Sequence, residues 1–228
     1  IPPATCPNLP SWEADDKPLY HALAARGCEP VAAVWHDPAI DWKRFDAVLI
    51  RTTWDYMDKR DAFVDWARRV ESQTRLFNPA SIVAWNTSKT YLRDLKQRGV
   101  PIAPTVWLRK GQRIDVACTM VRRGWTRGFI KPVIGSTARE TLRFNDDVAG
   151  VTAAQQHLDR MLASQDMMLQ PYLSRVETEG EHSAIFIEGV FSHAVQKIPA
   201  DGDYRVQDDF GAKDHPVSLR TEEMELAR

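Results

Sequence analysis

Residues 129–138 read FIKPVIGSTA, a short apolar strand that ends at Lys131 and Pro132 and runs into a turn of small residues. A lysine at a strand end beside such a turn can hold phosphate oxygens, because its ammonium is a point charge and the N–H groups and hydroxyls of the turn add fixed donors. A surface lysine before an ordinary turn is the alternative, since small polar residues are common in turns. The surrounding elements decide between the two.

Alternating strands and helices surround this segment. Near it we predict strands at 105–108, 129–132, 139–144 and 167–170, and helices at 113–123 and 147–163. Closer to the amino end we predict strands at 30–35 and 45–50, helices at 15–27, 59–72 and 87–98, and a connector at 76–85. At the amino end, strand, helix and strand in short alternation predict a parallel α/β sheet, whose ligands lie at the carboxyl ends of its strands, where residues 51–55 are expected.

The last part of the chain is more polar. We predict a hairpin of strands 183–188 and 190–197 around Gly189, a loop at 201–212 and an uncapped helix at 219–227. Pro101 and Pro104 stiffen the link before strand 105–108 and mark a plausible domain boundary.

The 228-residue chain is balanced in charge, with 30 Lys and Arg against 31 Asp and Glu. This balance argues against a general nucleic-acid or acidic-membrane binder. No apolar run approaches the ~20 residues of a membrane span, and no secretory signal is visible. The three cysteines, Cys6, Cys28 and Cys118, lack metal-site spacing, so we expect reduced thiols in a cytoplasmic protein.

The common short motifs of nucleotide, zinc and hydrolase sites are missing, among them Walker A, GxGxxG, CxxC, HExxH and GxSxG. A bound nucleotide would therefore need another device. The six histidines show no ligand spacing and are more typical of structural histidines than of a metal site. We expect Trp35, Trp66 and Trp107 to lie in the core.

Two further cations fit an anionic ligand. Lys89 is expected in the first turn of helix 87–98, where a lysine opposes the helix dipole and an approaching anion would explain it; a solvated cation is the alternative. Asp203, Arg205 and Gln207 alternate, so an extended backbone puts them on one face. The guanidinium there could clamp a phosphoryl group, and a polar strand edge is the alternative.

Three other segments carry polar groups at element ends. Residues 170–173 (QPYL) offer backbone groups that can pair with an adenine edge, or they form a plain linker. Glu179 and Glu181 can accept from ribose hydroxyls or support a metal, or they form a solvated turn. Residues 51–55 (RTTWD) can bind the carboxylate and amine of a small substrate, or they form an ordinary turn with a helix cap.

In this order the segments resemble the ATP-grasp superfamily, in the branch of prokaryotic glutathione synthetase and RimK-like ligases. They look most similar to the cyclo-ligase of D-cycloserine biosynthesis, which closes O-ureido-D-serine. The resemblance rests on RTTWDY (51–56), WNTSK (85–89), FIKP (129–132), QPY (170–172), EGE (179–181) and YRVQ (204–207). It implies an α/β ATP-grasp fold with a parallel substrate-side domain at 1–85, a lid lobe at 86–170 and an incomplete carboxyl-terminal lobe at 171–228.

The resemblance also implies roles for individual residues. ATP is expected on the phosphate lysines, the small-residue loop, the adenine hinge and the ribose carboxylates, which are Lys89, Lys131, Gly135, Ser136, Thr137, Gln170, Tyr172, Leu173, Glu179 and Glu181. The γ-phosphate and the acyl intermediate are expected to face Lys197 and Arg205. The substrate is expected on Arg51, Thr52, Thr53, Trp54 and Asp55.

The implied activity is an ATP-dependent ligation of a carboxylate with an amine-type nucleophile through an acyl phosphate, in its sharper form an intramolecular cyclo-ligation of an amino-acid derivative. A glutathione-synthetase-like or RimK-like peptide-bond ligase is one alternative. A non-catalytic nucleotide-binding module is another.

The implied cofactors are ATP and Mg²⁺. The family places an Asp and a later Glu/Asn pair on two strands as magnesium ligands, and nothing after Gly211 resembles those strands. We therefore expect metal ligands beyond residue 228, in a natural protein that continues for some tens of residues. The expected partner is a small carboxylate or amino-acid substrate, without nucleic acid or membrane, and a homodimer is left open.

Overall fold

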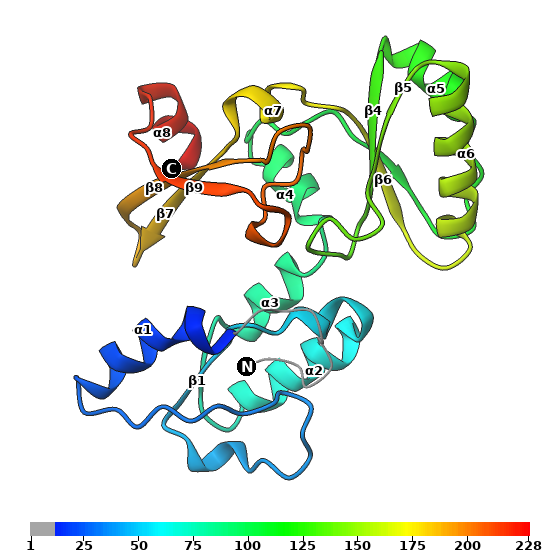
Figure 1. The fold of residues 1–228 in the computed structure, drawn as a ribbon. Coiled ribbons are helices and arrows are strands. Elements are labelled where there is room, and N and C mark those ends of the chain that lie inside the picture. The colour runs from blue at the N-terminus through cyan, green and yellow to red at the C-terminus, as the bar shows by residue number, and fades with distance from the viewer. Residues whose placement is uncertain (1–11) are drawn as a thin grey trace. The chain divides into compact units, whose positions relative to one another are not determined.

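The computed structural model describes residues 12–228, which form two compact units (Figure 1). The first unit reaches Tyr91 and includes Ile134–Ser136, and the second contains Leu92–Val133 and Thr137–Arg228. The three-part division at 85/86 and 170/171 stays a prediction. Cys28 and Cys118 carry free thiols, whereas Cys6 lies outside the described residues.

The first unit is a small parallel α/β layer. Its elements are α1 (Trp12–Ala24), η1 (Trp42–Arg44), β1 (Ala47–Leu49), η2 (Trp54–Asp58), α2 (Arg60–Glu71), β2 (Arg75–Phe77) and α3 (Ala80–Asn86). Strands β1 and β2 pair in parallel with Val48 opposite Leu76. The predicted strand at 30–35 is wrong, because this segment forms no ladder although Ala33 and Trp35 are buried. The predicted connector at 76–85 is wrong as well, since β2 and α3 occupy it.

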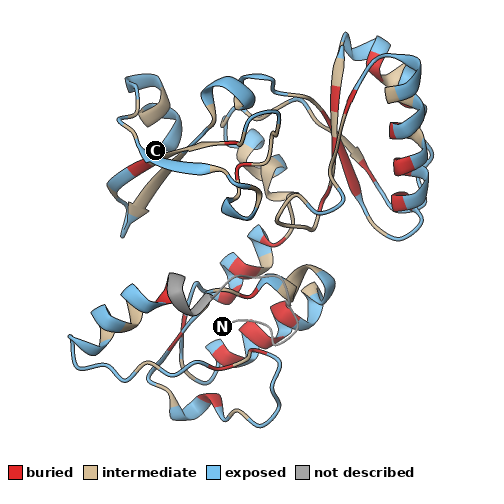
Figure 2. Ribbon diagram, viewed as in Figure 1, coloured by how far each residue is buried: buried red, intermediate tan, exposed pale blue. Residues whose placement is uncertain are grey.

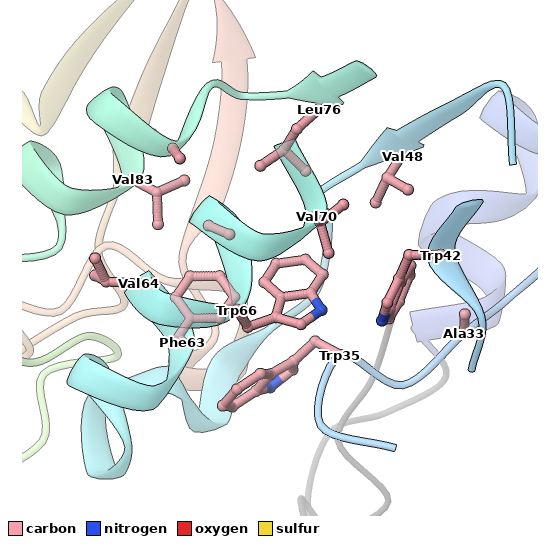
Figure 3. Close-up of a cluster of buried hydrophobic side chains, with 12 residues drawn as sticks. Ala33, Trp35, Trp42, Val48, Phe63, Val64, Trp66, Val70, Leu76 and Val83 are labelled. Carbon is pink, nitrogen blue, oxygen red and sulfur yellow. The ribbon is translucent and has the colours of Figure 1, made fainter. Parts of the chain in front are cut away.

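Aromatic rings fill the core of the first unit (Figure 3). Helix α2 buries Phe63, Val64, Trp66, Ala67 and Val70 at helical spacing. The rings of Phe63 and Trp66 stack at 5.3 Å, and Trp35 and Trp42 meet Trp66 edge-on. The core positions predicted for Trp35 and Trp66 are confirmed.

The second unit begins with a helix and an antiparallel sheet. Its elements are α4 (Tyr91–Gln97), β3 (Val106–Leu108), α5 (Val116–Arg123), β4 (Arg127–Pro132), β5 (Leu142–Asn145), α6 (Val148–Leu162) and β6 (Met167–Pro171). The strand order is β3-β6-β4-β5. Asp115 and Asp147 cap α5 and α6 by accepting from the amides of Cys118 and Gly150. Trp107 is only half-buried, with Arg93 at 4.4 Å over its ring, so its predicted core position is wrong.

Alternate residues of strand β4 lie on opposite faces of this sheet. Gly128, Ile130 and Pro132 are buried, and Ile130 joins the core that includes Leu158 of α6. Helices α5 and α6 both cover this face (Figure 1), and their buried sides are seen in Figure 2. Arg127, Phe129 and Lys131 alternate with the buried residues and therefore lie on the other face.

A second antiparallel sheet closes the chain. Its elements are α7 (Arg175–Glu179), β7 (Glu181–Ile187), β8 (Val190–Ile198), η3 (Asp208–Phe210), β9 (Lys213–Pro216) and α8 (Thr221–Ala227), with strand order β7-β8-β9. The predicted tight hairpin is present, and the two residues between its strands, Glu188 and Gly189, both have positive φ, as a two-residue hairpin turn requires. Strand β9 was not predicted. Helix α8 is capped, contrary to prediction, because the Glu223 carboxylate accepts from the Arg220 amide at 2.8 Å.

Replacing Gly128 tests the packing of the sheet β3-β6-β4-β5, the first sheet of the second unit. A Cβ at this position would overlap the ring of buried Phe144. We expect Gly128→Ala to lower the free energy of unfolding by about 1–3 kcal/mol, the range for overpacked cores, as measured by urea denaturation. Phe144→Leu in the same chain should recover part of that loss. Equal stability of Gly128→Ala and the wild type would contradict this account of the face.

Candidate functional site

In the sheet β3-β6-β4-β5, the face opposite α5 and α6 carries a half-buried cation. Lys131 is the last outward residue of β4, and its ammonium lies 5.8 Å from the ring centroid of Phe129. Burial lowers the pKa of Lys131, and the negative charge of Glu181 acts against that shift. Lys131 and Glu181, 50 positions apart in sequence, are thus electrostatic neighbours, as a shared site requires.

Glu181 begins β7 and lies opposite Lys197 of β8 in the ladder. The ammonium of Lys197 is 3.8 Å from Asp214 of β9. Glu179 sits at the end of α7, where both its carboxylate oxygens accept from the exposed guanidinium of Arg175 at 2.7 and 2.5 Å. The structure therefore brings Lys131, Glu181 and Lys197 into one region and gives Glu179 a local partner.

The hinge segment 170–173 is held by the sheet. Gln170 is buried, and its side-chain amide donates to Thr105 at 2.7 Å. The backbone amide of Tyr172 donates to the Arg127 carbonyl at 2.9 Å. Leu173 is 60% exposed, and its carbonyl accepts from the Val176 amide. Among residues 12–228, no partner is found for the amide of Leu173, which leaves it as the hinge donor available to a ligand.

A cluster of cations and aromatics surrounds Tyr172. Arg127 lies 4.4 Å and Arg143 5.5 Å from its ring centroid, and its hydroxyl donates to Glu177. Arg143 also donates to Glu177 at 2.5 Å, and Arg127 does so at 3.3 Å. The hydroxyl of Tyr172, followed by the two guanidinium groups, holds the pKa of Glu177 below its ordinary value.

Sequence reasoning missed Arg143, Glu177 and Phe129. The available signal was alternation: in β4 an arginine, an aromatic and a lysine occupy positions 127, 129 and 131, and Arg143 lies opposite Phe129 in β5. Cationic and aromatic side chains that share one face of a sheet form a surface suited to a planar anionic ligand.

The guanidinium of Arg205 is held between a carboxylate and an aromatic ring. Its guanidinium donates to both carboxylate oxygens of Asp203, at 2.6 to 3.0 Å, and lies 3.7 Å from the ring centroid of Phe210. No strand covers 203–207, so the expected alternation on one face stays a prediction, although the side chains of Asp203 and Arg205 do meet. The side-chain oxygen of Gln207 is buried without a partner in the described part of the chain.

Lys89 lies in the turn between α3 and α4, so its predicted position in a first helical turn is wrong. Its ammonium donates to the carbonyl of Gly135 at 2.6 Å. The hydroxyl of Ser136 faces the sulfur of Met57 at 3.9 Å. Beyond this point Thr137, Ala138 and Glu140 all have positive φ, a tight and uncommon backbone for residues with a side chain.

Residues 51–55 are largely engaged inside the first unit. Arg51 donates twice to the buried carboxylate of Asp16, at 2.9 and 2.7 Å. Asp55 accepts from the Trp35 indole at 2.8 Å and lies 3.4 Å from His36 and 3.5 Å from Lys59. Thr53 is buried.

Two groups of this segment are not engaged in this way. The Thr52 hydroxyl is buried with no partner among the residues that the structure describes, and Trp54 is 39% exposed. A hollow of about 730 Å³ beside α2 is lined by Trp35, Trp42 and Trp66 and by none of residues 51–55.

No group of three or more His, Cys, Asp or Glu side chains within residues 12–228 could hold a metal ion. Across the same residues, no helix is both long and apolar enough to span a membrane.

Two family models match the chain. Residues 2–78 match the N-terminal domain of the D-cycloserine synthetase DcsG, and residues 116–228 match the ATP-grasp domain of prokaryotic glutathione synthetase. The cycloserine biosynthesis protein DcsG of Streptomyces lavendulae is 34% identical over 187 residues, which are 80% of this chain and 62% of that protein. The chain thus spans less than two thirds of the length of this curated relative.

Solved structures of ATP-grasp ligases are also similar to this chain. The crystal structure of D-cycloserine synthetase DcsG matches with a TM-score of 0.80 and 28% identity, over 94% of this chain and 73% of that one. The ATP-grasp ligase PsnB, complexed with a minimal precursor, matches with a TM-score of 0.61 and 19% identity, over 96% and 78% of the two chains. A RimK domain ATP-grasp protein of Sphaerobacter thermophilus matches with a TM-score of 0.57 and 14% identity, over 85% and 84%. The last two likenesses show the fold alone.

Arg51 is expected to act on stability through Asp16. Arg51→Ala leaves a buried carboxylate without its charged donor, and we expect it to lower the free energy of unfolding by about 2–3 kcal/mol. Urea denaturation measures this loss. Arg75→Ala is the matched control, because Arg75 is exposed and has no ion pair in the described chain. An Arg51→Ala chain as stable as the control would show that the pair with Asp16 is not structural.

Glu177 is expected to make stability depend on pH. Because its folded-state pKa is lowered, its contribution is complete above the ordinary glutamate pKa of about 4.3 and is lost as pH falls through the lower folded value. The difference in unfolding free energy between wild type and Glu177→Gln should therefore shrink as pH falls below about 4. Glu225→Gln, at an exposed glutamate of α8 without an ion pair in residues 12–228, should show no such trend. A pH-independent difference for Glu177→Gln would overturn this expectation.

Proposed function

Because residues 116–228 match an ATP-grasp family model, we propose that this chain belongs to the ATP-grasp superfamily and serves an ATP-dependent ligase that activates a carboxylate as an acyl phosphate and joins it to an amine-type nucleophile. In its sharper form the reaction closes a ring within one amino-acid derivative, as expected of a D-cycloserine type cyclo-ligase. The likeness to DcsG supports this form. The observation that carries the proposal is Lys131, a half-buried cation at the end of β4 whose pKa is lowered by burial.

A half-buried ammonium with a lowered pKa is stabilised by an anion that replaces its lost hydration. In this proposal Lys131 and Lys89 hold phosphate oxygens, and the loop of Gly135, Ser136 and Thr137 closes over them. The Leu173 amide donates to adenine, because the Tyr172 amide already donates to Arg127. Glu181 accepts from the ribose, with Glu179 nearby.

Phosphoryl transfer needs alignment and charge neutralisation more than covalent help from the protein. A carboxylate oxygen of the substrate attacks the γ-phosphorus, and ADP leaves. The amine nitrogen then attacks the acyl carbon, and phosphate leaves. Arg205 and Lys197 offset the negative charge that builds up in the two steps. Thr52 and Trp54 are the groups of segment 51–55 that the structure leaves to contact the substrate.

The cofactor Mg²⁺ is expected for this chemistry, and the described residues offer no ligand set that fits it. No step is therefore assigned to the metal here. A second candidate is a non-catalytic nucleotide-binding module. The match of residues 116–228 to glutathione synthetase supports a third, a peptide-bond ligase of the glutathione-synthetase or RimK type.

Lys131 and Arg205 give the experiment that tests the proposal. We expect Lys131→Met to weaken binding of a non-hydrolysable ATP analogue at least ~10-fold in calorimetric titration. Its unfolding temperature should not fall, because a half-buried charge is removed. We expect Arg205→Ala to lower ADP release with a carboxylate substrate by ~100-fold while binding is retained.

Lys110→Met, at an exposed lysine, is the control and should change neither quantity. Analogue binding without ADP release for any carboxylate would favour the binding module over the ligase. Equal binding by Lys131→Met and wild type would overturn the nucleotide site itself.

A further inference from the structure

We propose that Tyr204 is a positioning residue that ties the tight turn 137–141 to the backbone carrying Arg205. This inference rests on the proposed function, since Arg205 is there the residue that faces the transferring phosphoryl group. From the sequence, no role is predicted for Tyr204 or Thr141, although Tyr204 lies within the YRVQ segment that carries the resemblance.

The hydrogen bond between Tyr204 and Thr141 has a defined direction. Their hydroxyl oxygens are 2.9 Å apart, and the Thr141 hydroxyl also lies 2.8 Å from the carbonyl of Ala138, to which it donates. A threonine hydroxyl has one proton, so Tyr204 is the donor in the bond to Thr141. Tyr204 therefore holds the group that closes the turn.

The turn itself is constrained by Thr141. Its amide and its hydroxyl both donate to the carbonyl of Ala138, at 3.2 and 2.8 Å. Three residues within the turn, Thr137, Ala138 and Glu140, have positive φ. Residues with side chains hold such a backbone only where the surroundings enforce it. Because Thr137 belongs to the loop that is proposed to close over phosphate, the turn sets where that loop ends.

The ring of Tyr204 is fixed on the face of the first sheet. It meets Phe129 edge-on at 5.3 Å and Tyr172 edge-on at 6.3 Å, and Arg143 lies 5.2 Å from its centroid. The neighbouring Val206 is buried. Tyr204 therefore has little freedom to move apart from strands β4 and β5.

Asp203 extends this restraint to Arg205. Its Oδ1 accepts from the amides of both Tyr204 and Arg205, at 2.7 and 3.0 Å, while its carboxylate holds the guanidinium. The guanidinium of Arg205 is thus held by Asp203, and Asp203 also binds the backbone of Tyr204, whose ring packs on the sheet. The hydroxyl of Tyr204 therefore couples the position of the turn 137–141 to the position of Arg205.

Removing only the hydroxyl of Tyr204 tests this coupling. We expect Tyr204→Phe to lower kcat about tenfold, with KM for ATP and the unfolding temperature unchanged. Thr141→Val should lower kcat at least as much, and adding Tyr204→Phe to it should change nothing further, because both act through one bond. Thr141→Ser retains the hydroxyl and should restore the wild-type rate. Tyr20→Phe, in α1, is the control for loss of a phenol elsewhere.

A second measurement is independent of activity. Amide hydrogen exchange of the segment 137–141 in the ligand-free protein should be about fivefold faster in Tyr204→Phe and unchanged in Thr141→Ser. A wild-type kcat in Tyr204→Phe overturns the positioning role, whatever the exchange rate. A raised KM together with a lowered unfolding temperature also overturns it, in favour of plain packing. If the wild type neither binds the ATP analogue nor shows turnover, the proposed function has failed, and unchanged exchange in Tyr204→Phe overturns the tether separately.

Discussion

The two-sided alternation of strand β4 is the constraint on which the second unit depends. Gly128 and Ile130 face the helices, and Gly128 has room for nothing larger because the ring of Phe144 lies against it. This close packing fixes which residues face the other way. Arg127, Phe129 and Lys131 are thereby presented on one surface, and Arg143, Tyr172 and Tyr204 gather against them. A register shift of one residue would bury the cations and expose the core.

Most charged groups of this surface are already paired with an opposite charge, and Lys131 is the exception among the described residues. Glu177 engages Tyr172, Arg143 and Arg127, and Asp203 engages Arg205. Lys131 differs, because burial weakens its charged form and the one compensating charge identified is that of Glu181. A nucleotide phosphate beside Lys131 would restore the lost solvation, whereas a phosphate beside Arg205 would share the guanidinium with Asp203. Under the proposed function, the first contact would favour nucleotide binding, and the second would favour the step in which charge develops.

The sequence predicts most elements, and its failures have physical reasons. Helices α2, α5 and α6 and the hairpin of β7 and β8 follow from periodicity and turn chemistry, which are local. The segment 30–35 has strand-like residues but no neighbour to form a ladder with among residues 12–228, and a ladder depends on the rest of the chain. Lys89 precedes α4 because the helix begins only at Tyr91. The cluster around Tyr172, which directly follows β6, joins residues from β4, β5 and α7, so no single stretch of sequence could reveal it.

Segment 51–55 shows how a charged motif can shape a site without offering its charge. The carboxylate of Asp16 is 2% exposed, so Arg51 cannot turn to a substrate without leaving a buried anion uncompensated. Asp55 is likewise engaged by Trp35, whose ring belongs to the aromatic core. These two ion-pairing residues therefore fix the backbone between them. The proposed function assigns the contact with substrate to the Thr52 hydroxyl, which is buried without a partner in the described chain, and to the exposed Trp54 ring, which would distinguish substrates by hydrogen bonding and shape. Selectivity that arises in this way depends on the rigidity of the first unit, because a hydroxyl and a ring discriminate only when they are held in place.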